Sequence, residues 1–170
     1  FRLSRTLGRG GMATVYDAED TRLGTRIALK VSHHGAADPG PIERFHREAR
    51  FAQRLHHLFV CPVFEDGEID GYHYLTMPLV EGMPLEKRIG LAHPWLEPDA
   101  ASLIRRLALA LHAVHQAGVI HRDLKPNNVM LKPTGEPVLM DFGLARDISG
   151  LEVRMTAVGV ALGTLAYICL

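Results

Sequence analysis

The segment 121–128, HRDLKPNN, places polar side chains of different chemistry directly after the apolar run 117–120. Asp123 and Asn128 are five residues apart in a stretch that is not expected to be helical. An Asp can accept or orient the proton of a substrate hydroxyl, an Asn oxygen can hold a metal ion, and Lys125 can neutralise charge on a phosphoryl group in transfer. The spacing therefore indicates phosphoryl transfer as a candidate chemistry.

A second acidic residue supports this interpretation. Asp141 follows Asp123 by 18 residues, ends the strand-like run 137–141, and is followed by Phe142 and a glycine. A carboxylate at the end of an apolar strand and before a glycine is well placed for Mg²⁺. Taken singly, each of these residues is more often a turn or cap residue, but their joint pattern favours a catalytic site.

The N-terminal segment LGRGGMATVY contains a glycine motif, Gly8-x-Gly10-x-x-Ala13. Glycines let a backbone approach phosphates closely and expose N–H donors. The dinucleotide-binding fingerprint also tolerates Ala in its third place, so the motif alone leaves a dinucleotide-binding oxidoreductase open. That fingerprint needs a following helix and an acid about 20 residues on. Here 14–20 is strand-like and 28–30 reads Ala-Leu-Lys, which favours a glycine-rich β-hairpin.

Lys30 and Glu48 are predicted to form an ion pair. Alternation along the strand places Lys30 on the face that lies under the glycine-rich hairpin if the two strands pair. Glu48 stands on the apolar flank of the helix expected over 41–55, where a carboxylate is costly to bury without a partner. The alternatives are a solvated Lys30 and a Glu48 at the rim paired with Arg44 or Arg47.

The elements that must position these residues indicate an α+β fold. Strands are expected within 14–31 and 59–80, with turns at Asp66-Gly67 and Asp70-Gly71. A second long helix is expected over 98–117, with Gly118 as its terminator. Short strands and a turn follow up to residue 141. The layout is a β-rich half with one helix, followed by a helical half with an irregular polar loop.

Composition restricts the class of partner. The chain has 170 residues, of which 47% are hydrophobic, and Lys+Arg and Asp+Glu both number 19. This balance gives no case for binding nucleic acid or an anionic membrane. Cys61 and Cys169 lack metal-ligand spacing, which favours a reduced intracellular protein, and no apolar run is long enough to span a membrane. Phe1 in place of an initiator Met predicts a piece of a longer protein, so a membrane anchor beyond residue 170 is left open.

The chain resembles serine/threonine protein kinases, and especially bacterial eukaryotic-like kinases. The motifs that carry the resemblance are, in chain order, LGRGGMATVY, IALK, FHREA, HRDLKPNN and DFG. The resemblance covers essentially the whole chain. It implies a two-lobed kinase domain with ATP between the lobes. The N-lobe, an antiparallel sheet plus one helix with the glycine-rich loop and the hinge, is expected over 1–80. Part of a helical C-lobe, with the catalytic loop and activation segment, is expected over 81–170.

The resemblance also implies residue roles. Lys30 contacts the α- and β-phosphates and pairs with Glu48, Asp123 is the catalytic base, and Asn128 and Asp141 hold Mg²⁺, with Mn²⁺ as an alternative. Lys125 marks the serine/threonine class, and Thr164 braces Asp123 and Lys125. The expected ATP-binding set, which includes the hinge after Met77, is Leu7, Gly8, Arg9, Gly10, Gly11, Met12, Ala13, Val15, Ala28, Lys30, Met77, Pro78, Leu79 and Val80.

The implied partners are proteins with Ser or Thr acceptors, in the cytoplasm. Arg122 before the catalytic Asp implies regulation by phosphorylation of the segment 144–162, including self-phosphorylation at Thr156, or at Ser149. Two departures stand out: Ala13 replaces the third glycine, and the sequence after Thr164 lacks the family's next proline and A/S-P-E motif. We therefore expect a chain truncated in the activation segment. The alternative function is a non-catalytic ATP-binding or interaction fragment.

Overall fold

The computed structural model describes residues 1–34, 39–91, 94–142 and 146–147. The chain forms two compact units: Phe1–His56 with Cys61–Glu81, and His57–Val60 with the residues from Gly82 onward. His57–Val60 fell within the predicted N-lobe, but they join the second unit through β9 (Pro137–Leu139). Phe59 accepts a hydrogen bond from the Leu139 N–H, and Val60 forms a parallel bridge with the same residue.

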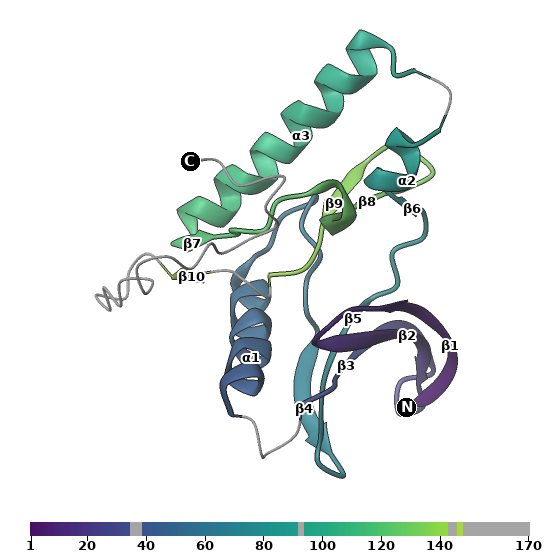
Figure 1. Ribbon diagram of the computed structural model, residues 1–170, viewed down its shortest axis with the longest axis vertical. Helices are drawn as coiled ribbons and strands as arrows, with labels where there is room; N and C mark the ends of the chain where they lie inside the picture. The colour runs from purple at the N-terminus through teal and green to yellow at the C-terminus, as the bar shows by residue number, and fades with distance from the viewer. Residues whose placement is uncertain (35–38, 92–93, 143–145, 148–170) are drawn as a thin grey trace. The chain divides into compact units, whose positions relative to one another are not determined.

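The first unit is built on a five-stranded antiparallel sheet with the order β1-β2-β3-β5-β4 (Figure 1). The tight turn between β4 and β5 is the predicted Asp70-Gly71, and both residues have positive φ, 52° and 80°. The other predicted turn, Asp66-Gly67, is wrong because these residues lie inside β4 and pair with β5. The strand bounds are β1 Arg2–Arg9, β2 Ala13–Asp20, β3 Thr25–Ser32, β4 Glu65–Ile69 and β5 Tyr72–Pro78.

Helix α1 (Pro39–Arg54) belongs to the first unit and contacts β4. Phe45, Ala49 and Ala52 are buried at helical spacing as the sequence predicts, and Phe51 is buried as well. A polar contact fixes the same helix to two strands. His46 bonds Asp66 of β4 through Nδ1, at 2.9 Å, and His73 of β5 through Nε2, at 3.0 Å.

Asp17 is a carboxylate buried within this sheet, with 2% of its surface exposed. Arg26 bonds both of its oxygens, at 2.8 and 2.6 Å, and Arg5 adds a bond of 3.2 Å. The hydrogen bonds from Arg26 lower the pKa of Asp17 from 3.8 to about 2, against the opposing effect of burial. The native state therefore holds this carboxylate charged at a pH where the unfolded chain is protonated.

This pair makes the stability of the chain depend on pH. Between pH 4 and pH 2 the unfolded state binds more protons at Asp17 than the native state does, so the contribution of Asp17 is present above about pH 4 and lost as the pH falls through about 2. Asp17→Asn should therefore destabilise the chain near neutral pH, and its difference from wild type should shrink in acid. Urea unfolding from pH 7 to pH 2.5 measures this difference.

Glu19→Gln, at an exposed ion pair with Arg2, is the control and should change the stability by less than about 0.5 kcal/mol. A difference for Asp17→Asn that does not vary with pH would contradict the prediction.

The second unit contains the long helix α3 (Glu97–Gln116), which contacts β7 (Val119–Ile120) and β9. The helix starts with Pro98 in its first turn and ends before Gly118, whose φ of 75° stops it as predicted. Its buried residues are Leu103, Leu107, Ala110 and Val114. The remaining elements are β6 Met83–Pro84, α2 Leu85–Ile89, a 3₁₀ turn η1 Pro126–Asn128, β8 Val129–Leu131 and β10 Arg146–Asp147.

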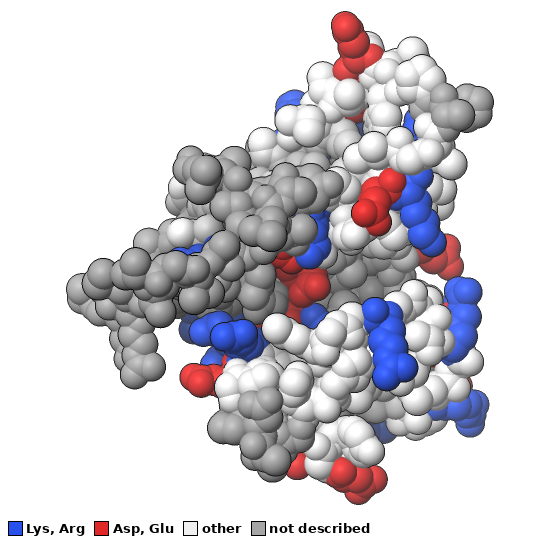
Figure 2. All heavy atoms as spheres, viewed as in Figure 1, with Lys and Arg blue, Asp and Glu red and all other residues white. Residues whose placement is uncertain are grey.

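Strands β6, β8 and β9 form one small sheet, and β10 pairs with β7 in another. On the face seen in Figure 2, basic and acidic side chains are interspersed with uncharged ones over the described surface, in keeping with the zero net charge. Among the described residues, none of the helices combines the length and apolar character that crossing a membrane requires.

Candidate active site

Four residues of the predicted ATP-binding set share one face of the first unit's sheet. Strand pairing sets Val15 opposite Lys30, and Ala28 opposite both Asp17 on β2 and Met77 on β5. Paired residues lie on the same side of a sheet, and so do residues two apart on one strand. Val15, Ala28, Lys30 and Met77 therefore form one surface, in which Ala28 and Met77 are buried.

Lys30 and Glu48 form the predicted ion pair. Lys30 Nζ lies 2.7 Å from Glu48 Oε1 and 2.8 Å from Oε2. Only 13% of the Lys30 side chain and 7% of the Glu48 side chain are exposed. This contact replaces both alternatives, a solvated lysine and a carboxylate paired at the helix rim. Each charge offsets part of the other's desolvation, so removing either side chain takes a close counter-charge away from a buried group.

The glycine motif lies between β1 and β2 and is followed by a strand, not by a helix. The Gly10 N–H donates to Ala13 O at 2.9 Å, which closes the turn. A Cβ built on Gly8 or Gly11 would meet nothing within 4 Å, and one on Gly10 would meet only Ala13 O at 3.7 Å. Packing within the described structure therefore does not require glycine at these positions. The open backbone is what a loop needs if a phosphate is to approach it closely.

Ala13, which departs from the family pattern, is the first residue of β2, buried and paired with Ser32. Leu7, Arg9 and Met12 of the predicted ATP-binding set are exposed. The expected hinge residues, Pro78, Leu79 and Val80, run from the end of β5 and are half-buried.

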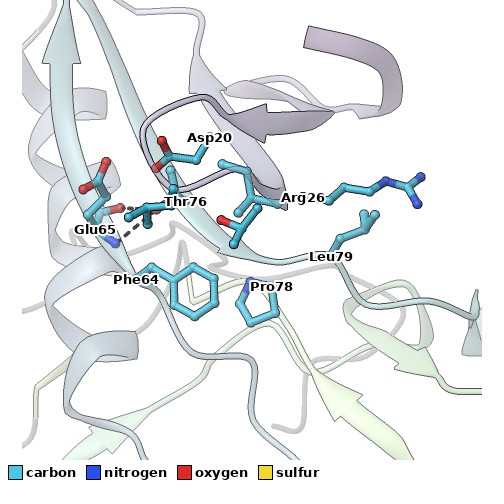
Figure 3. A pocket seen from close by; sticks show the side chains of 10 residues that line it. Asp20, Arg26, Phe64, Glu65, Thr76, Pro78 and Leu79 are labelled. Carbon is cyan, nitrogen blue, oxygen red and sulfur yellow. Dashed lines mark hydrogen bonds between the residues drawn. The ribbon is translucent and has the colours of Figure 1, made fainter. Parts of the chain in front are cut away.

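A cavity of about 640 Å³ lies in the first unit, lined in part by Ile27, Thr76 and Pro78. On their strands these residues alternate with Ala28 and Met77, so the cavity opens on the opposite side of the sheet from Lys30. Figure 3 shows the rings of Phe64 and Pro78 at its wall, with the hydrogen bonds between Glu65 and Thr76 above them in the view. Pro78 and Leu79 of the predicted hinge are part of its lining, whereas Lys30, Ala28 and Met77 are not.

In the second unit, the polar side chains of the segment 121–128 gather around Asp123. Lys125 Nζ lies 2.7 Å from Asp123 Oδ2, and Asn128 Nδ2 donates to the Asp123 backbone O at 2.8 Å and to Oδ2 at 3.0 Å. Lys125 is extended, as the residue before a proline prefers, and Pro126 then opens the 3₁₀ turn that carries Asn128. These donors fix the orientation of the Asp123 carboxylate.

The buried His121 side chain supports the segment 121–128. The imidazole is buried, its Nδ1 accepts the Asp123 N–H at 3.3 Å, and its Nε2 donates to Met140 O at 3.1 Å. Phe142 packs on the ring, with centroids 4.8 Å apart. Burial lowers the pKa of His121, so the ring is neutral and carries its proton on Nε2. His121 therefore has a structural role beneath Asp123.

A backbone hydrogen bond joins the residue before Asp141 to Asn128. The Met140 N–H donates to Asn128 O at 2.8 Å, and Asp141 follows directly. Its φ of 63° is in the left-handed region, as is that of Arg122 at 64°, and such backbone in a non-glycine residue costs about 1 kcal/mol or more. Strain of this kind is typical of functional sites.

Asn128 and Asp141 supply donors that fit Mg²⁺. A carboxylate and an amide oxygen are hard ligands, and Mg²⁺ at phosphate sites takes one or two protein ligands beside waters and phosphate oxygens. The Asn128 nitrogen is directed to Asp123, so its amide oxygen is the atom that would bind a metal. In the part of the chain that the structure describes, no three His, Cys, Asp or Glu side chains are grouped to hold a metal alone. Thr164, Ser149 and Thr156 lie outside the described residues.

One residue that contacts the glycine-rich loop was missed by sequence reasoning. The His33 N–H donates to Met12 O of the loop at 2.9 Å, and its Nε2 lies 2.7 Å from Thr14 Oγ1 of β2. The sequence shows only an adjacent pair of histidines after a strand, and no motif marks either as functional. The contact depends on the β2–β3 register, which a local pattern does not reveal.

The comparison with known proteins agrees with the geometry. The family described as "Protein kinase domain" matches residues 1–169. The chain is 40% identical over 168 residues to serine/threonine-protein kinase PknE of Mycobacterium bovis, covering 98% of this chain and 29% of that protein. It is equally similar to PknH of Mycobacterium tuberculosis, with 98% and 26% covered. It is 35% identical over 173 residues to probable serine/threonine-protein kinase pknA2 of Bifidobacterium longum, with 99% and 22% covered.

The chain thus spans less than a third of the length of these curated relatives. The predicted α+β kinase fold is confirmed, and the dinucleotide-binding alternative is excluded by the strand that follows the glycine motif. The chain belongs to the protein kinase family and is related to bacterial eukaryotic-like serine/threonine kinases.

Proposed function

We propose that the chain is part of a kinase that transfers the γ-phosphoryl group of Mg·ATP to Ser or Thr hydroxyls of proteins. The observation that carries this proposal is the buried Lys30–Glu48 ion pair on the same sheet face as Val15, Ala28 and Met77. A lysine held in place by a buried carboxylate is suited to bind a phosphate as a fixed point charge.

In the first unit, the backbone N–H groups of the glycine-rich loop and Lys30 bind the phosphates. Val15, Ala28 and Met77 provide the apolar surface for adenine, and the backbone from Pro78 to Val80 provides its hydrogen bonds. Leu7, Arg9 and Met12 flank the loop. The open backbone at Gly8 and Gly11 supports this assignment, because it leaves room for a phosphate.

In the second unit, Asp123 orients the acceptor hydroxyl and takes its proton, and Lys125 stabilises the charge on the phosphoryl group. The short contacts of Lys125 and Asn128 with Asp123 support these roles, because they place the three side chains within one hydrogen-bonded group. Mg²⁺, or Mn²⁺ in its place, supplies charge neutralisation when bound. Asn128 and Asp141 would hold it, and Thr164 would brace Asp123 and Lys125.

The proposed partners are cytoplasmic proteins with Ser or Thr acceptors. Self-phosphorylation at Thr156, or at Ser149, is part of the proposal. Arg122 supports it, because a guanidinium beside the catalytic Asp can pair with a phosphate group.

The proposal is tested by thermal unfolding of the chain with and without Mg·ATP. A ligand that binds only the native state at a hundred times its Kd stabilises that state by about 2.7 kcal/mol, so the midpoint should rise by several degrees. Lys30→Met and Asp141→Asn should each lose most of this rise, because one removes a phosphate contact and the other a metal ligand. The comparison uses the shift caused by the nucleotide, so a loss of intrinsic stability in either variant does not obscure it.

Lys132→Met is the matched control, because Lys132 pairs with Glu136 away from the proposed site. It should keep the full nucleotide-dependent rise. A cooperative wild-type transition that does not move with Mg·ATP would contradict the proposed function.

A further inference from the structure

We propose that His33 is a positioning residue, which holds the glycine-rich loop where the loop covers the ATP phosphates. The proposal rests on the proposed function, since it assigns His33 to that nucleotide site. His33 lies directly after β3 and makes three contacts with the loop and its following strand. Its backbone N–H donates to Met12 O at 2.9 Å, and its ring contacts Thr14 Oγ1 at 2.7 Å and Gly11 O at 3.3 Å.

The backbone contact extends the sheet into the loop. The paired register of β2 and β3 ends at Ala13 and Ser32. The bond from His33 to Met12 adds one further link, within the segment whose amides are assigned to the phosphates. The second half of the loop is thereby joined to the strand that carries Lys30.

The two ring contacts determine the tautomer of His33. A carbonyl oxygen only accepts hydrogen bonds, so the Nδ1 that faces Gly11 O carries a proton. In the neutral ring, Nε2 then accepts from the Thr14 hydroxyl. The neutral ring therefore makes both contacts.

The loop needs such a contact because its own packing is sparse. Gly11 lies in the turn beyond the paired residues of β1 and β2, and a side chain there would meet no atom within 4 Å, so no side-chain packing confines it. A segment with several glycines loses more conformational entropy on ordering than one with side chains. Thr14, by contrast, is buried and fixed in β2. The His33 ring therefore links the least confined part of the hairpin to a fixed residue.

Replacing His33 should act on ATP binding and not on the chemical step. His33→Ala should raise the KM for ATP about three- to tenfold, the range for one or two lost positioning hydrogen bonds, with kcat changed by less than about twofold. His33→Asn keeps a donor at the place of Nδ1 but does not reach Thr14, so its effect should be partial. Thr14→Val removes only the Thr14 contact and should match His33→Asn.

The test combines hydrogen exchange of the nucleotide-free chain with Mg·ATP titration of the same samples. In His33→Ala, the amides of residues 8–14 should exchange faster than in wild type and Mg·ATP should bind more weakly, with His33→Asn and Thr14→Val in between. His56→Ala, at another exposed histidine of the same unit, is the control and should change neither quantity.

Unchanged loop exchange in His33→Ala would overturn the inference, and so would faster exchange with unchanged ATP affinity. A wild-type chain that binds no Mg·ATP, while its loop exchange still depends on His33, would overturn the proposed function. That result would also remove the role of His33 in ATP binding, although the contact itself would stand.

Discussion

Asp123→Asn should lower kcat for phosphoryl transfer to a Ser/Thr acceptor peptide by about 10²- to 10⁴-fold, the usual contribution of a positioned general base. The amide has nearly the shape of the carboxylate but cannot take a proton at neutral pH. The substitution also removes the anion 2.7 Å from Lys125, so the lysine loses the group that fixes its position. The KM for ATP should change little, because the proposed phosphate contacts lie in the first unit.

The measurement is steady-state transfer of labelled phosphate from Mg·ATP, together with the nucleotide-dependent rise in the unfolding midpoint. The midpoint rise should survive in Asp123→Asn, which would show that the variant is folded and binds ATP. Glu136→Gln is the matched control, because Glu136 pairs with Lys132 outside the proposed site. A kcat within tenfold of wild type in Asp123→Asn would rule out Asp123 as the base.

Gly82→Ala should destabilise the second unit by about 2–4 kcal/mol, the sum expected for a strained backbone and a steric overlap. Gly82 has φ of 145°, and a Cβ built on it would lie 1.9 Å from Leu131 O and 2.8 Å from the Leu131 carbonyl carbon. Both are backbone atoms of β8, which pairs with the β6 strand that follows Gly82. The overlap cannot be relieved by turning a side chain, so the two strands must separate.

Two other glycines of the second unit provide graded controls for urea unfolding. Gly135 has φ of 78° but open space around it, so Gly135→Ala should show only the backbone cost of about 1–2 kcal/mol. Gly90 has ordinary contacts at 3.6 Å and no positive φ, so Gly90→Ala should change the stability little. If Gly82→Ala proved no more damaging than Gly135→Ala, the close approach of β6 and β8 would not be required.

Much of the site could be predicted because its residues are marked by local patterns. The alternation of β3 places Lys30 on the face under the hairpin, and the apolar flank of α1 shows that Glu48 needs a partner. Their ion pair therefore follows from sequence. Gly118 could likewise be identified as the end of α3, because a glycine after a periodic apolar stripe allows the left-handed conformation that stops a helix.

The remaining features depend on contacts between distant segments. Asp66-Gly67 has the composition of a turn, yet Gly67 lies in β4 opposite Tyr74, whose hydroxyl would be 2.7 Å from a Cβ there. The glycine serves close packing across the strands, not chain reversal. His33 is recognised only through the β2–β3 register. Ile104 of α3 is apolar yet 63% exposed, because the helix buries a narrow set of residues and contacts β7 and β9.

Helix α1 has attachments on two sides, and this has a mechanical consequence. His46 and Glu48 are two residues apart, which places them about 200° apart around the helix axis. His46 connects the helix to β4 and β5, while Glu48 connects it to β3. A roll of the helix that carried Glu48 away from Lys30 would also pull His46 off its partners. The contacts of His46 therefore restrict rotation of the helix about its axis. That restriction helps to keep Glu48 paired with Lys30.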